Sequence, residues 1–473
     1  MPPKKLDLFY VVIFVMLNLI LKSLYISYAE VSLDEPFSLM VAQMPAHEIP
    51  AFLSQYNNPP LFELILRPVV ATFGPVVPWI RIPSVVFSSL TVVFVYLIGT
   101  RFFSRKVGVF ASLFYTFATF QLYFAHEARV YALFNLLTCM SVFLFLTAKD
   151  KDRLHYTHPL LLLVNALLLY AHYFGFVVLA IELSWLVVFR YTYFKTLLLM
   201  MLTFVVSTVL YIPQLSIMLT RFADASKTHW VQTPSIDDLY YNLMKMLNAP
   251  VVAVAVIALL LAALVKLIGN RNTLVIDENA VFVFHWFLTA YFGLFLVSLF
   301  TPVFLDRYLI FISGAVYISI AISIDYLLGE EKSWPAYGIF VLLFVLSVNL
   351  KPDHGRRWKG LIENVAATKT PKTAVFIIPN WISVTYAYYY NLAYFKDYHQ
   401  TTTRLQLDGY YPINSVAELA STPIDSFDRI ILIDGGSRLV DKGQSVYKTL
   451  KQHFPEISAN KSFVGVEVYT FNK

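Results

Sequence analysis

The sequence has few charged residues and a single cysteine for its length. Of its 473 residues only 14% are charged and 58% are hydrophobic. An ordinary globular domain carries roughly 25% charged residues, so this deficit excludes a typical soluble enzyme, because much of the apolar surface must face lipid. The lone Cys139 excludes a disulfide framework and a thiolate metal site built from this chain alone.

The net charge of +6 could indicate a nucleic-acid partner. The basic residues, however, are scattered in short segments between apolar runs and do not form the continuous stripe that binds a phosphate backbone. Their pattern is typical of a protein oriented in a membrane. We therefore expect the lipid bilayer as a partner and no nucleic acid.

Apolar runs bounded by charge predict membrane spans, since a helix needs about 20 residues to cross the hydrocarbon. The first run is longer than a usual signal core, so we expect it to remain as an anchor. Two short runs, at 157–172 and 174–190, are predicted to form a tight hairpin. The eleven predicted spans are 8–27, 79–100, 107–123, 128–147, 157–172, 174–190, 196–219, 250–269, 281–300, 304–327 and 335–350.

The distribution of lysine and arginine predicts a cytoplasmic amino terminus in a multi-pass protein of the plasma (inner) membrane, because cytoplasmic loops carry the excess of these residues. Residues 60–73 are too short and too charged to span, so we predict an amphipathic helix in the outer interface, with Glu63 and Arg67 reaching water. The predicted cytoplasmic loops contain Arg101, Arg105, Lys106, Lys149, Lys151, Arg153, Arg190, Lys195, Lys266, Arg271 and Lys332.

The composition changes near residue 350 to a mixed polar and apolar sequence. Residues 373–379, 429–434 and 463–470 predict strands, and 381–392 and 441–453 predict helices. The fold class is thus a polytopic α-helical membrane protein with a small C-terminal α/β domain. We expect a membrane domain over 1–350 and, after eleven spans, an extracytoplasmic domain over 351–473.

Polar and ionisable residues gather at the predicted outer ends of the spans. Each has an ordinary explanation when taken alone: a carboxylate capping a helix, an arginine reaching the headgroups, or a tyrosine in the interfacial belt. Their convergence on one face is the main functional signal, since ionisable groups near the bilayer are costly. These candidates are Asp34, Glu35, Asn57, Asn58, His126, Glu127, Arg129, Tyr131, His172, Tyr173, His229, Arg307 and Tyr308.

These residue types suit the transfer of a group from a lipid phosphate. Guanidinium forks bind an anionic leaving phosphate strongly in a site that excludes water, and Arg129 and Arg307 fit that role. A carboxylate can take the proton from an attacking hydroxyl. Asp34 is our candidate base, with Glu127 as the second carboxylate.

Several short motifs occur in a characteristic order. They are Asp34-Glu35 after the first span, Asn58-Pro59-Pro60-Leu61-Phe62 before the interfacial helix, Arg81-Ile82-Pro83-Ser84, His126-Glu127-Ala128-Arg129-Val130-Tyr131, Tyr170-Ala171-His172-Tyr173, Arg307-Tyr308 and Trp358-Lys359-Gly360. In this order the chain resembles the C-type integral membrane glycosyltransferases. Within them it is most similar to the branch containing protein O-mannosyltransferases and lipid A aminoarabinose transferases.

This resemblance implies a donor sugar joined through phosphate to a polyprenol, and an inverting transfer to an acceptor hydroxyl of a protein, lipid or glycan on the outer side. It implies that Asp34 is the essential carboxylate of the first loop, that Glu127 is the acidic residue of the second, and that Arg307 binds the lipid phosphate. Many relatives have histidine or lysine where this chain has Asn58, and some have an acidic metal ligand where it has Asn57. We therefore predict no metal and no other cofactor.

Two other functions remain open from the sequence. A transporter or lipid flippase would place ionisable residues near the bilayer midplane, often in repeated halves, whereas the centres of the predicted spans are nearly free of charge. A non-catalytic scaffold of the same fold is the second alternative, and the retention of both Asp34 and Glu127 disfavours it.

Overall fold

The computed structural model of the chain describes residues 5–32, 34–56, 58–148, 154–188, 194–225, 231–269, 277–353 and 355–473. They divide into two compact units. The first unit is Met1–Ile26, Pro45–Val69 and Pro78–Pro352, and the second is Ser27–Met44, Val70–Val77 and Asp353–Lys473. The second unit therefore contains two segments from the first 350 residues, and one of them carries Asp34.

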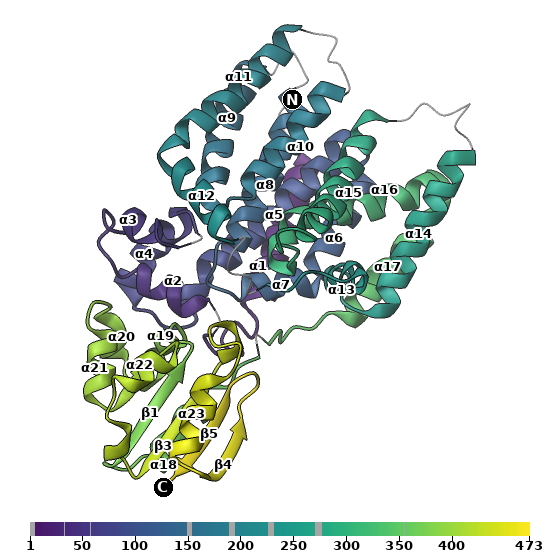
Figure 1. The fold of residues 1–473 in the computed structure, drawn as a ribbon. Helices are drawn as coiled ribbons and strands as arrows, with labels where there is room; N and C mark the ends of the chain where they lie inside the picture. Colours follow the sequence, from purple (N-terminus) through teal and green to yellow (C-terminus); the bar gives the residue numbers. More distant parts are fainter. Residues whose placement is uncertain are drawn as a thin grey trace. The chain divides into compact units, whose positions relative to one another are not determined.

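The first unit is a bundle of apolar helices (Figure 1). Among the residues that the structure describes, six helical segments are long and apolar enough to cross a membrane, and each coincides with a predicted span. They are α1 (Lys5–Ser23), α5 (Ile82–Phe102) with the preceding η1 (Trp79–Arg81), α8 (Tyr131–Ala148), α14 (Pro250–Gly269), α15 (Glu278–Ser298), and α16 (Ser313–Lys332) with the preceding η3 (Asp306–Ile312).

Two predicted spans are helix pairs with a sharp bend. The pair α6 (Arg105–Thr116) and α7 (Thr119–Ala125) bends by 59°, and the pair α11 (Phe194–Leu210) and α12 (Ile212–Ala225) bends by 71°. Pro213 lies in the first turn of α12, where a missing N–H is tolerated, but it cannot continue the preceding helix. At the other bend, the Asn248 side chain accepts a bond from Thr119 N–H and donates to Phe117 O, so it satisfies backbone groups released by the break.

The three remaining predicted spans are shorter apolar helices, α9 (Leu154–Ala171), α10 (Gly175–Val188) and α17 (Trp334–Ser347). The α9 and α10 helices are joined by a turn at residues 172–174, as the predicted hairpin requires. A multi-pass membrane protein is therefore confirmed, whereas the number of eleven spans stays a prediction.

A pair of glycines allows α5 and α6 to pack closely. A Cβ atom built on Gly99 would lie 2.5 Å from the Cα of Gly108, which is too close for any side chain. Small residues let helices in a membrane approach backbone to backbone and gain van der Waals contact. An alanine at either position would therefore separate the two helices.

The amphipathic segment predicted at 60–73 is the helix α4 (Leu61–Phe73). The prediction that its carboxylate reaches water is wrong, because Glu63 is only 2% exposed. The Arg129 guanidinium lies opposite this carboxylate, and a buried charge is tolerated when it is paired. The unit also contains the short helices α3 (Ile49–Leu53) and α13 (Ile236–Met246).

The second unit contains a five-stranded sheet in the order β2-β1-β3-β5-β4. The first three strands are parallel, and β5 runs antiparallel to both β3 and β4. The strands are β1 (Thr373–Ile378), β2 (Tyr410–Pro412), β3 (Arg429–Asp434), β4 (Glu456–Ser462) and β5 (Glu467–Asn472). The helices are α2 (Glu35–Val41), α18 (Trp358–Thr368), α19 (Ile382–Tyr390), α20 (Leu392–Lys396), α21 (Thr401–Leu407), α22 (Val416–Ala420) and α23 (Ser445–His453), with η4 (Ile424–Ser426) and η5 (Ser437–Leu439).

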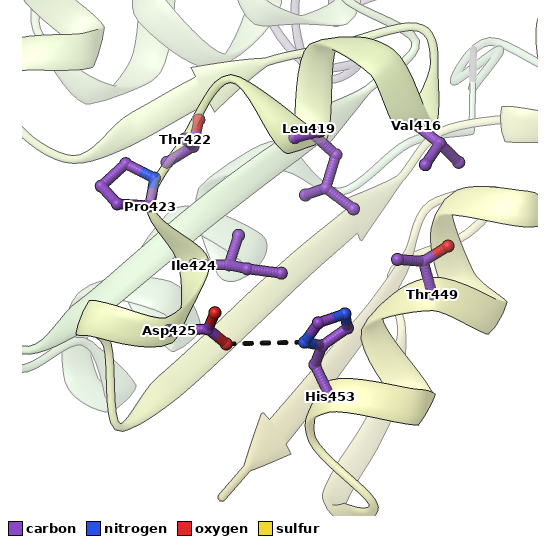
Figure 2. A pocket seen from close by; sticks show the side chains of 9 residues that line it. Val416, Leu419, Thr422, Pro423, Ile424, Asp425, Thr449 and His453 are labelled. Atoms are coloured by element: carbon purple, nitrogen blue, oxygen red, sulfur yellow. Dashed lines mark ion pairs between the residues drawn. The ribbon is translucent and has the colours of Figure 1, made fainter.

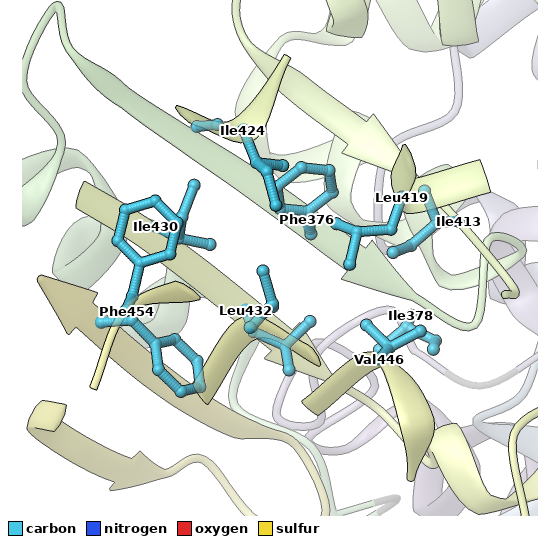
Figure 3. Packing of buried hydrophobic residues seen from close by; sticks show 12 residues of the cluster. Phe376, Ile378, Ile413, Leu419, Ile424, Ile430, Leu432, Val446 and Phe454 are labelled. Carbon is cyan, nitrogen blue, oxygen red and sulfur yellow. The ribbon is translucent and has the colours of Figure 1, made fainter. Parts of the chain in front are cut away.

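The central strands form the core of this unit. Phe376 and Ile378 of β1 lie beside Ile430 and Leu432 of β3 (Figure 3), and Phe454, which directly follows helix α23, belongs to the same cluster. These strand positions alternate, so one face of the sheet supplies the cluster. Every residue of β1 is buried, which means that both faces of the sheet are covered at its centre.

The predicted strands at 373–379 and 429–434 are confirmed as β1 and β3, whereas the prediction for 463–470 is correct only for residues 467–470, which belong to β5. That range crosses the turn between β4 and β5, where Val464 and Gly465 have φ of 44° and 79°. Strand β4 was not predicted, because its sequence is mostly polar. The predicted helix at 381–392 is divided at the extended residue Asn391, whose side chain accepts from Ala393 N–H and begins α20.

Candidate active site

The turn between α7 and α8 buries three ionisable side chains. His126, Glu127 and Arg129 are 1%, 4% and 4% exposed. The turn is closed by a hydrogen bond of 2.8 Å from Arg129 N–H to Glu127 O. Since a buried charge is costly without compensation, these side chains need partners in the surrounding structure.

Arg129 is held between a carboxylate and an aromatic ring. Its Nη1 atom lies 3.9 Å from Glu63 Oε1, and both side chains are at most 5% exposed. Its guanidinium lies 6.0 Å from the ring centre of Tyr131, within the range of a cation–π contact. The sequence analysis missed the role of Glu63, although a lone carboxylate in an apolar helix could have indicated a buried partner.

His172 lies in the turn between α9 and α10 and packs against aromatic rings. Its ring is stacked on Phe134 at 4.7 Å and lies 5.6 Å from the ring of Tyr308. Burial, followed by the nearby charges of Arg129 and Arg307, lowers the pKa of His172 to about 3. The imidazole is therefore neutral near pH 7.

The tautomer of this imidazole follows from its hydrogen bond. His172 Nδ1 accepts from the N–H of Phe174 at 3.2 Å. In a neutral imidazole that accepts at Nδ1, the proton resides on Nε2. His172 can thus donate a hydrogen bond from Nε2 without adding a positive charge.

The third part of the cluster is η3, which carries Arg307 and Tyr308. The Arg307 guanidinium lies 5.5 Å from the Tyr308 ring centre. Its backbone N–H donates to Asp306 Oδ1 at 2.7 Å, and the other oxygen of that carboxylate lies 2.8 Å from Lys245 Nζ. The start of η3 is thereby fixed to α13.

The structure thus brings together groups from two turns and the helix η3, which are distant in the sequence. Electrostatic interactions connect His172 with both Arg129 and Arg307, and connect Tyr123 with Glu127 and Arg307. Tyr123 could not be singled out from the sequence, because tyrosine is frequent throughout this chain. Two guanidinium groups, tyrosines and a neutral imidazole form a surrounding suited to an oxyanion.

Other predicted residues have different surroundings. His126 Nε2 donates to the backbone oxygen of Lys22 at 2.8 Å, so this ring nitrogen is used to hold the end of α1. Tyr173 and Asn58 are half-buried in the first unit. Asn57 and His229 lie outside the described residues.

The candidate base and its neighbour belong to the second unit, whereas Glu127 belongs to the first. Asp34 is half-buried and precedes α2, but its side chain makes no capping hydrogen bond to that helix. Glu35, in the first turn of α2, is 1% exposed. The prediction that Asp34 and Glu127 share one pocket stays a prediction.

A shallow hollow of about 310 Å³ lies on the second unit and contains no predicted site residue. Its wall includes the ion pair of His453 Nδ1 and Asp425 Oδ1 at 3.5 Å (Figure 2). The remaining lining is largely aliphatic. The hollow is lined by Val416, Leu419, Ala420, Thr422, Pro423, Ile424, Asp425, Thr449 and His453.

Among the residues that the structure describes, no group of three or more histidine, cysteine, aspartate or glutamate side chains could hold a metal ion. The predicted positions Asn57 and His229 are not part of that set. The absence of a metal therefore stays a prediction for the chain as a whole.

A family model described as dolichyl-phosphate-mannose-protein mannosyltransferase matches residues 57–217. No curated protein sequence matches the chain. ArnT from Cupriavidus metallidurans bound to undecaprenyl phosphate has a TM-score of 0.60 at 12% identity, with 98% of each chain covered.

Two further solved structures are similar to this chain. The apo state of the same ArnT has a TM-score of 0.61 at 12% identity, covering 98% of this chain and 97% of its own. The archaeal oligosaccharyltransferase AglB from Archaeoglobus fulgidus, in complex with an inhibitory peptide and a dolichol-phosphate, has a TM-score of 0.55 at 12% identity, covering 94% of this chain and 71% of its own. The chain has the C-type glycosyltransferase fold.

The C-type glycosyltransferase fold confirms the resemblance inferred from the sequence motifs. The family-model match, 57–217, includes Glu63, Glu127, Arg129 and His172. Asp34 and Arg307 lie outside that match. At 12% identity the likeness establishes the fold alone.

Proposed function

We propose that this protein transfers a sugar from a polyprenyl-phosphate donor to an acceptor hydroxyl on the outer face of the plasma membrane. The observation that carries the proposal is the cluster of Arg129, Arg307 and neutral His172 in the membrane unit. The proposal is also supported by the fold, since ArnT binds undecaprenyl phosphate and AglB binds a dolichol-phosphate in their structures.

The cluster is suited to the phosphate of the donor. Arg129 and Arg307 provide forked donors whose charge-assisted bonds are strong in a site that excludes water. His172 Nε2 and the Tyr308 hydroxyl add neutral donors. As the sugar leaves, the phosphate gains negative charge, so these groups bind the departing phosphate more tightly than the ester.

The reaction is a single displacement at the anomeric carbon. The acceptor oxygen attacks that carbon while its bond to the phosphate oxygen breaks, and the electron pair leaves with the polyprenyl phosphate. Asp34 takes the proton of the acceptor hydroxyl as its oxygen bonds to the sugar. The anomeric configuration inverts, as in other single displacements at a sugar.

The leaving phosphate needs no protonating acid, so one general base suffices. Glu127 is then left to bind a hydroxyl of the acceptor or the sugar. With the amino terminus in the cytoplasm, the C-terminal domain and the site lie outside, where a lipid-linked donor is the available source of activated sugar. The sugar and the acceptor are not specified by these residues.

The test is Asp34→Asn in the purified full-length protein with polyprenyl-phosphate mannose as the probe donor. We expect transfer to fall about 10²- to 10⁴-fold, the usual contribution of a general base. Binding of undecaprenyl phosphate should be retained, because the phosphate cluster is intact. The exposed carboxylate of α13, in Asp237→Asn, is the control and should have wild-type activity.

Two outcomes would contradict the proposal. Full transfer by Asp34→Asn would remove the proposed base. Flux of a lipid or solute in proteoliposomes that does not require Asp34 would favour a transporter. Release of polyprenyl phosphate that depends on both the acceptor and Asp34 would support the transferase.

A further inference from the structure

The parallel strands of the C-terminal domain have a topology in which ligands bind at one edge of the sheet. Strand β1 lies between β2 and β3, and all three run in the same direction. The chain therefore continues from β1 to one neighbour and later returns to the other. In open α/β sheets, ligands bind beyond the carboxyl ends of the strands at such a change of direction. In this domain that position is at the carboxyl ends of β1 and β3.

The segments that follow the three strands lie close together at this edge. Gly435 N–H donates to Ile378 O at 2.8 Å. Asn380 N–H donates to Asn414 Oδ1 at 2.9 Å, which joins the segment after β1 to the segment after β2. Gly435 is buried, and a Cβ atom there would lie 2.6 Å from Ile382 Cδ1. The glycine therefore lets the turn after β3 pack against the start of α19.

The turn after β3 is not arranged to hold a phosphate. The backbone N–H groups of a glycine-rich turn are the donors that a phosphate uses. Here Asp434 Oδ1 accepts from the N–H of Gly436 at 2.9 Å and of Ser437 at 2.6 Å. A carboxylate thus occupies these donors, and its negative charge would repel a phosphate. This turn is better suited to a ligand without a phosphate group.

Side chains at the edge combine an aromatic ring with hydrogen-bonding groups. Trp381, just before α19, is 51% exposed, and the preceding Asn380 is exposed as well. Arg356, which precedes α18 and is half-buried, donates from Nη2 to Gly435 O at 3.3 Å. A guanidinium has five N–H groups, so this one bond leaves donors for a ligand.

A sugar ring fits this combination of groups. The C–H groups on one face of the ring are apolar and can stack on an indole. The hydroxyls around the ring need donors and acceptors. The amide of Asn380 provides both, and the remaining N–H groups of Arg356 donate to neutral oxygens as well as to anions.

The first loop belongs to the same compact unit as this edge, since Ser27–Met44 clusters with Asp353–Lys473. The N–H of Lys359, three residues after Arg356, donates to Glu30 Oε2 at 3.1 Å. Glu30 precedes the candidate base Asp34 by four residues. The segment that carries Arg356 therefore runs beside the loop that carries the base, which favours an acceptor over a ligand unrelated to the reaction.

We propose that the carboxyl ends of β1 and β3 bind a sugar residue of the acceptor, with Trp381 stacking on the ring and Asn380 and Arg356 bonding to its hydroxyls. The acceptor is then a glycan. This inference rests on the proposed function only in identifying the bound sugar as part of the acceptor. The binding itself does not require transfer.

The experiment measures binding of the purified full-length protein, in detergent, to an array of immobilised neutral and acidic oligosaccharides. We expect the wild type to bind, and Trp381→Ala to bind the same glycans about 10-fold more weakly, because the stacking contact is lost. Trp381→Tyr should keep most of the binding, since an aromatic face remains. Arg356→Gln should also bind about 10-fold more weakly, because a charged donor is removed.

Leu407→Ala is the matched control. Leu407 is 82% exposed and precedes β2, so it lies near the amino ends of the parallel strands, at the opposite edge. This variant should bind glycans like the wild type. If Trp381→Ala does not fold, Trp381→Leu decides, because it keeps an apolar side chain without an aromatic face: weaker binding supports the site, and unchanged binding contradicts it.

Three outcomes would overturn the sugar site. They are a wild-type protein that binds no oligosaccharide of the array, equal binding by the wild type and Trp381→Ala, and contact of Trp381 with lipid. Lipid is the other partner that an exposed tryptophan of a membrane protein contacts. Brominated phospholipids in nanodiscs should not quench the Trp381 emission, measured as the difference between the wild type and Trp381→Tyr.

A glycan that binds the array site can then be offered as acceptor, with polyprenyl-phosphate mannose as donor. We expect Trp381→Ala to raise the KM for this glycan about 10-fold and to leave kcat unchanged, because the residue binds the acceptor away from the reacting atoms. An unchanged KM would contradict its role in binding the acceptor.

The two proposals fail in different ways. Asp34→Asn should bind the same glycans as the wild type, because Asp34 is not part of the sugar site. Full transfer by Asp34→Asn with glycan binding intact would overturn the proposed base alone. A protein that binds no glycan but whose transfer requires Asp34 would overturn the sugar site alone.

Discussion

The two ends of the membrane unit use charge differently. Where α1 and α6 begin, Arg105 Nη2 lies 3.1 Å from Asp7 Oδ1, and Lys106 Nζ lies 2.9 Å from Asp325 Oδ1. Each cation there has one carboxylate at hydrogen-bonding distance. At the opposite end, where α8 begins, the charges of Arg129 and Arg307 act on His172, whose ring packs against aromatic rings.

This difference distinguishes ion pairs that join two helices from charged groups that are suited to bind a ligand. A close pair between helix ends fixes one helix against another and offers little to a ligand. At the other end, the Arg129 and Glu63 atoms are 3.9 Å apart, and Arg129 also interacts with a neutral histidine and a tyrosine ring. Such a cluster is better suited to bind a phosphate than a close ion pair between two helices, whose charges already neutralise each other.

The largest effect is expected from removing one partner of the buried pair at the His172 end. Glu63→Ala removes one carboxylate that pairs with the buried Arg129 guanidinium, and breaking a buried pair typically costs about 3–5 kcal/mol. We expect a lower unfolding temperature and lower transfer activity per folded molecule. Thermal unfolding in detergent and specific activity measure the two effects.

Asp325→Ala at the opposite end is the comparison. Its partner Lys106 is 10% exposed and also bonds to the Ser333 hydroxyl, so the loss of stability should be smaller. Activity per folded molecule should not change. Equal loss of activity in both variants would contradict the functional distinction between the ends.

The fold was largely predictable because its strongest signals are local. A run of about 20 apolar residues identifies a membrane helix without knowledge of its neighbours. The breaks at Ala118 and Tyr211 were missed because the apolar composition continues through them. Strand β4 was missed because its exposed, polar sequence lacks the alternation that identifies a half-buried strand.

The site was less predictable because pairing depends on tertiary structure. Glu63 was expected in water, and its contact with Arg129 joins residues 66 positions apart. The hydrogen bond from the Tyr389 hydroxyl to Val31 O links the first loop to the C-terminal domain, and no local sequence pattern indicates a contact between such distant residues. The sequence could indicate that such groups share a chemistry, whereas the structure was needed to identify the pairs.

A second prediction compares arginines at the two ends. Arg307→Gln removes a charged donor, and a hydrogen bond to a charged group contributes about 1.5–3 kcal/mol. We expect undecaprenyl phosphate to inhibit transfer about 10- to 100-fold more weakly. Arg307→Lys should have a smaller effect, because the charge remains while the forked geometry is lost.

Arg105→Gln is the matched control at the other end. The Arg105 side chain, which pairs with Asp7, is 41% exposed, so this ion pair contributes at most about 1 kcal/mol to stability. Inhibition by undecaprenyl phosphate should remain at the wild-type level. A similar weakening in Arg105→Gln and Arg307→Gln would indicate a general charge effect and would contradict a phosphate site near Arg307.

The smallest effect concerns the neutrality of His172. Burial and the two nearby arginines lower its pKa from 6.5 to about 3 in the folded protein. As the pH falls from about 6.5 toward 3, His172 binds a proton in the unfolded chain but not in the folded protein. The free energy of unfolding therefore decreases as the pH falls. We expect His172→Gln to lose less stability than the wild type between pH 7 and about 4.

His47→Gln is the control, because the His47 side chain is 84% exposed and should leave the pH dependence of unfolding unchanged. The same slope in His172→Gln and the wild type would mean that His172 is protonated in the folded protein. The cluster would then contain three adjacent cations, and the buried carboxylates nearby would be needed to neutralise them. A reduced slope would instead support a neutral imidazole that donates to phosphate and leaves the positive charge to the two arginines.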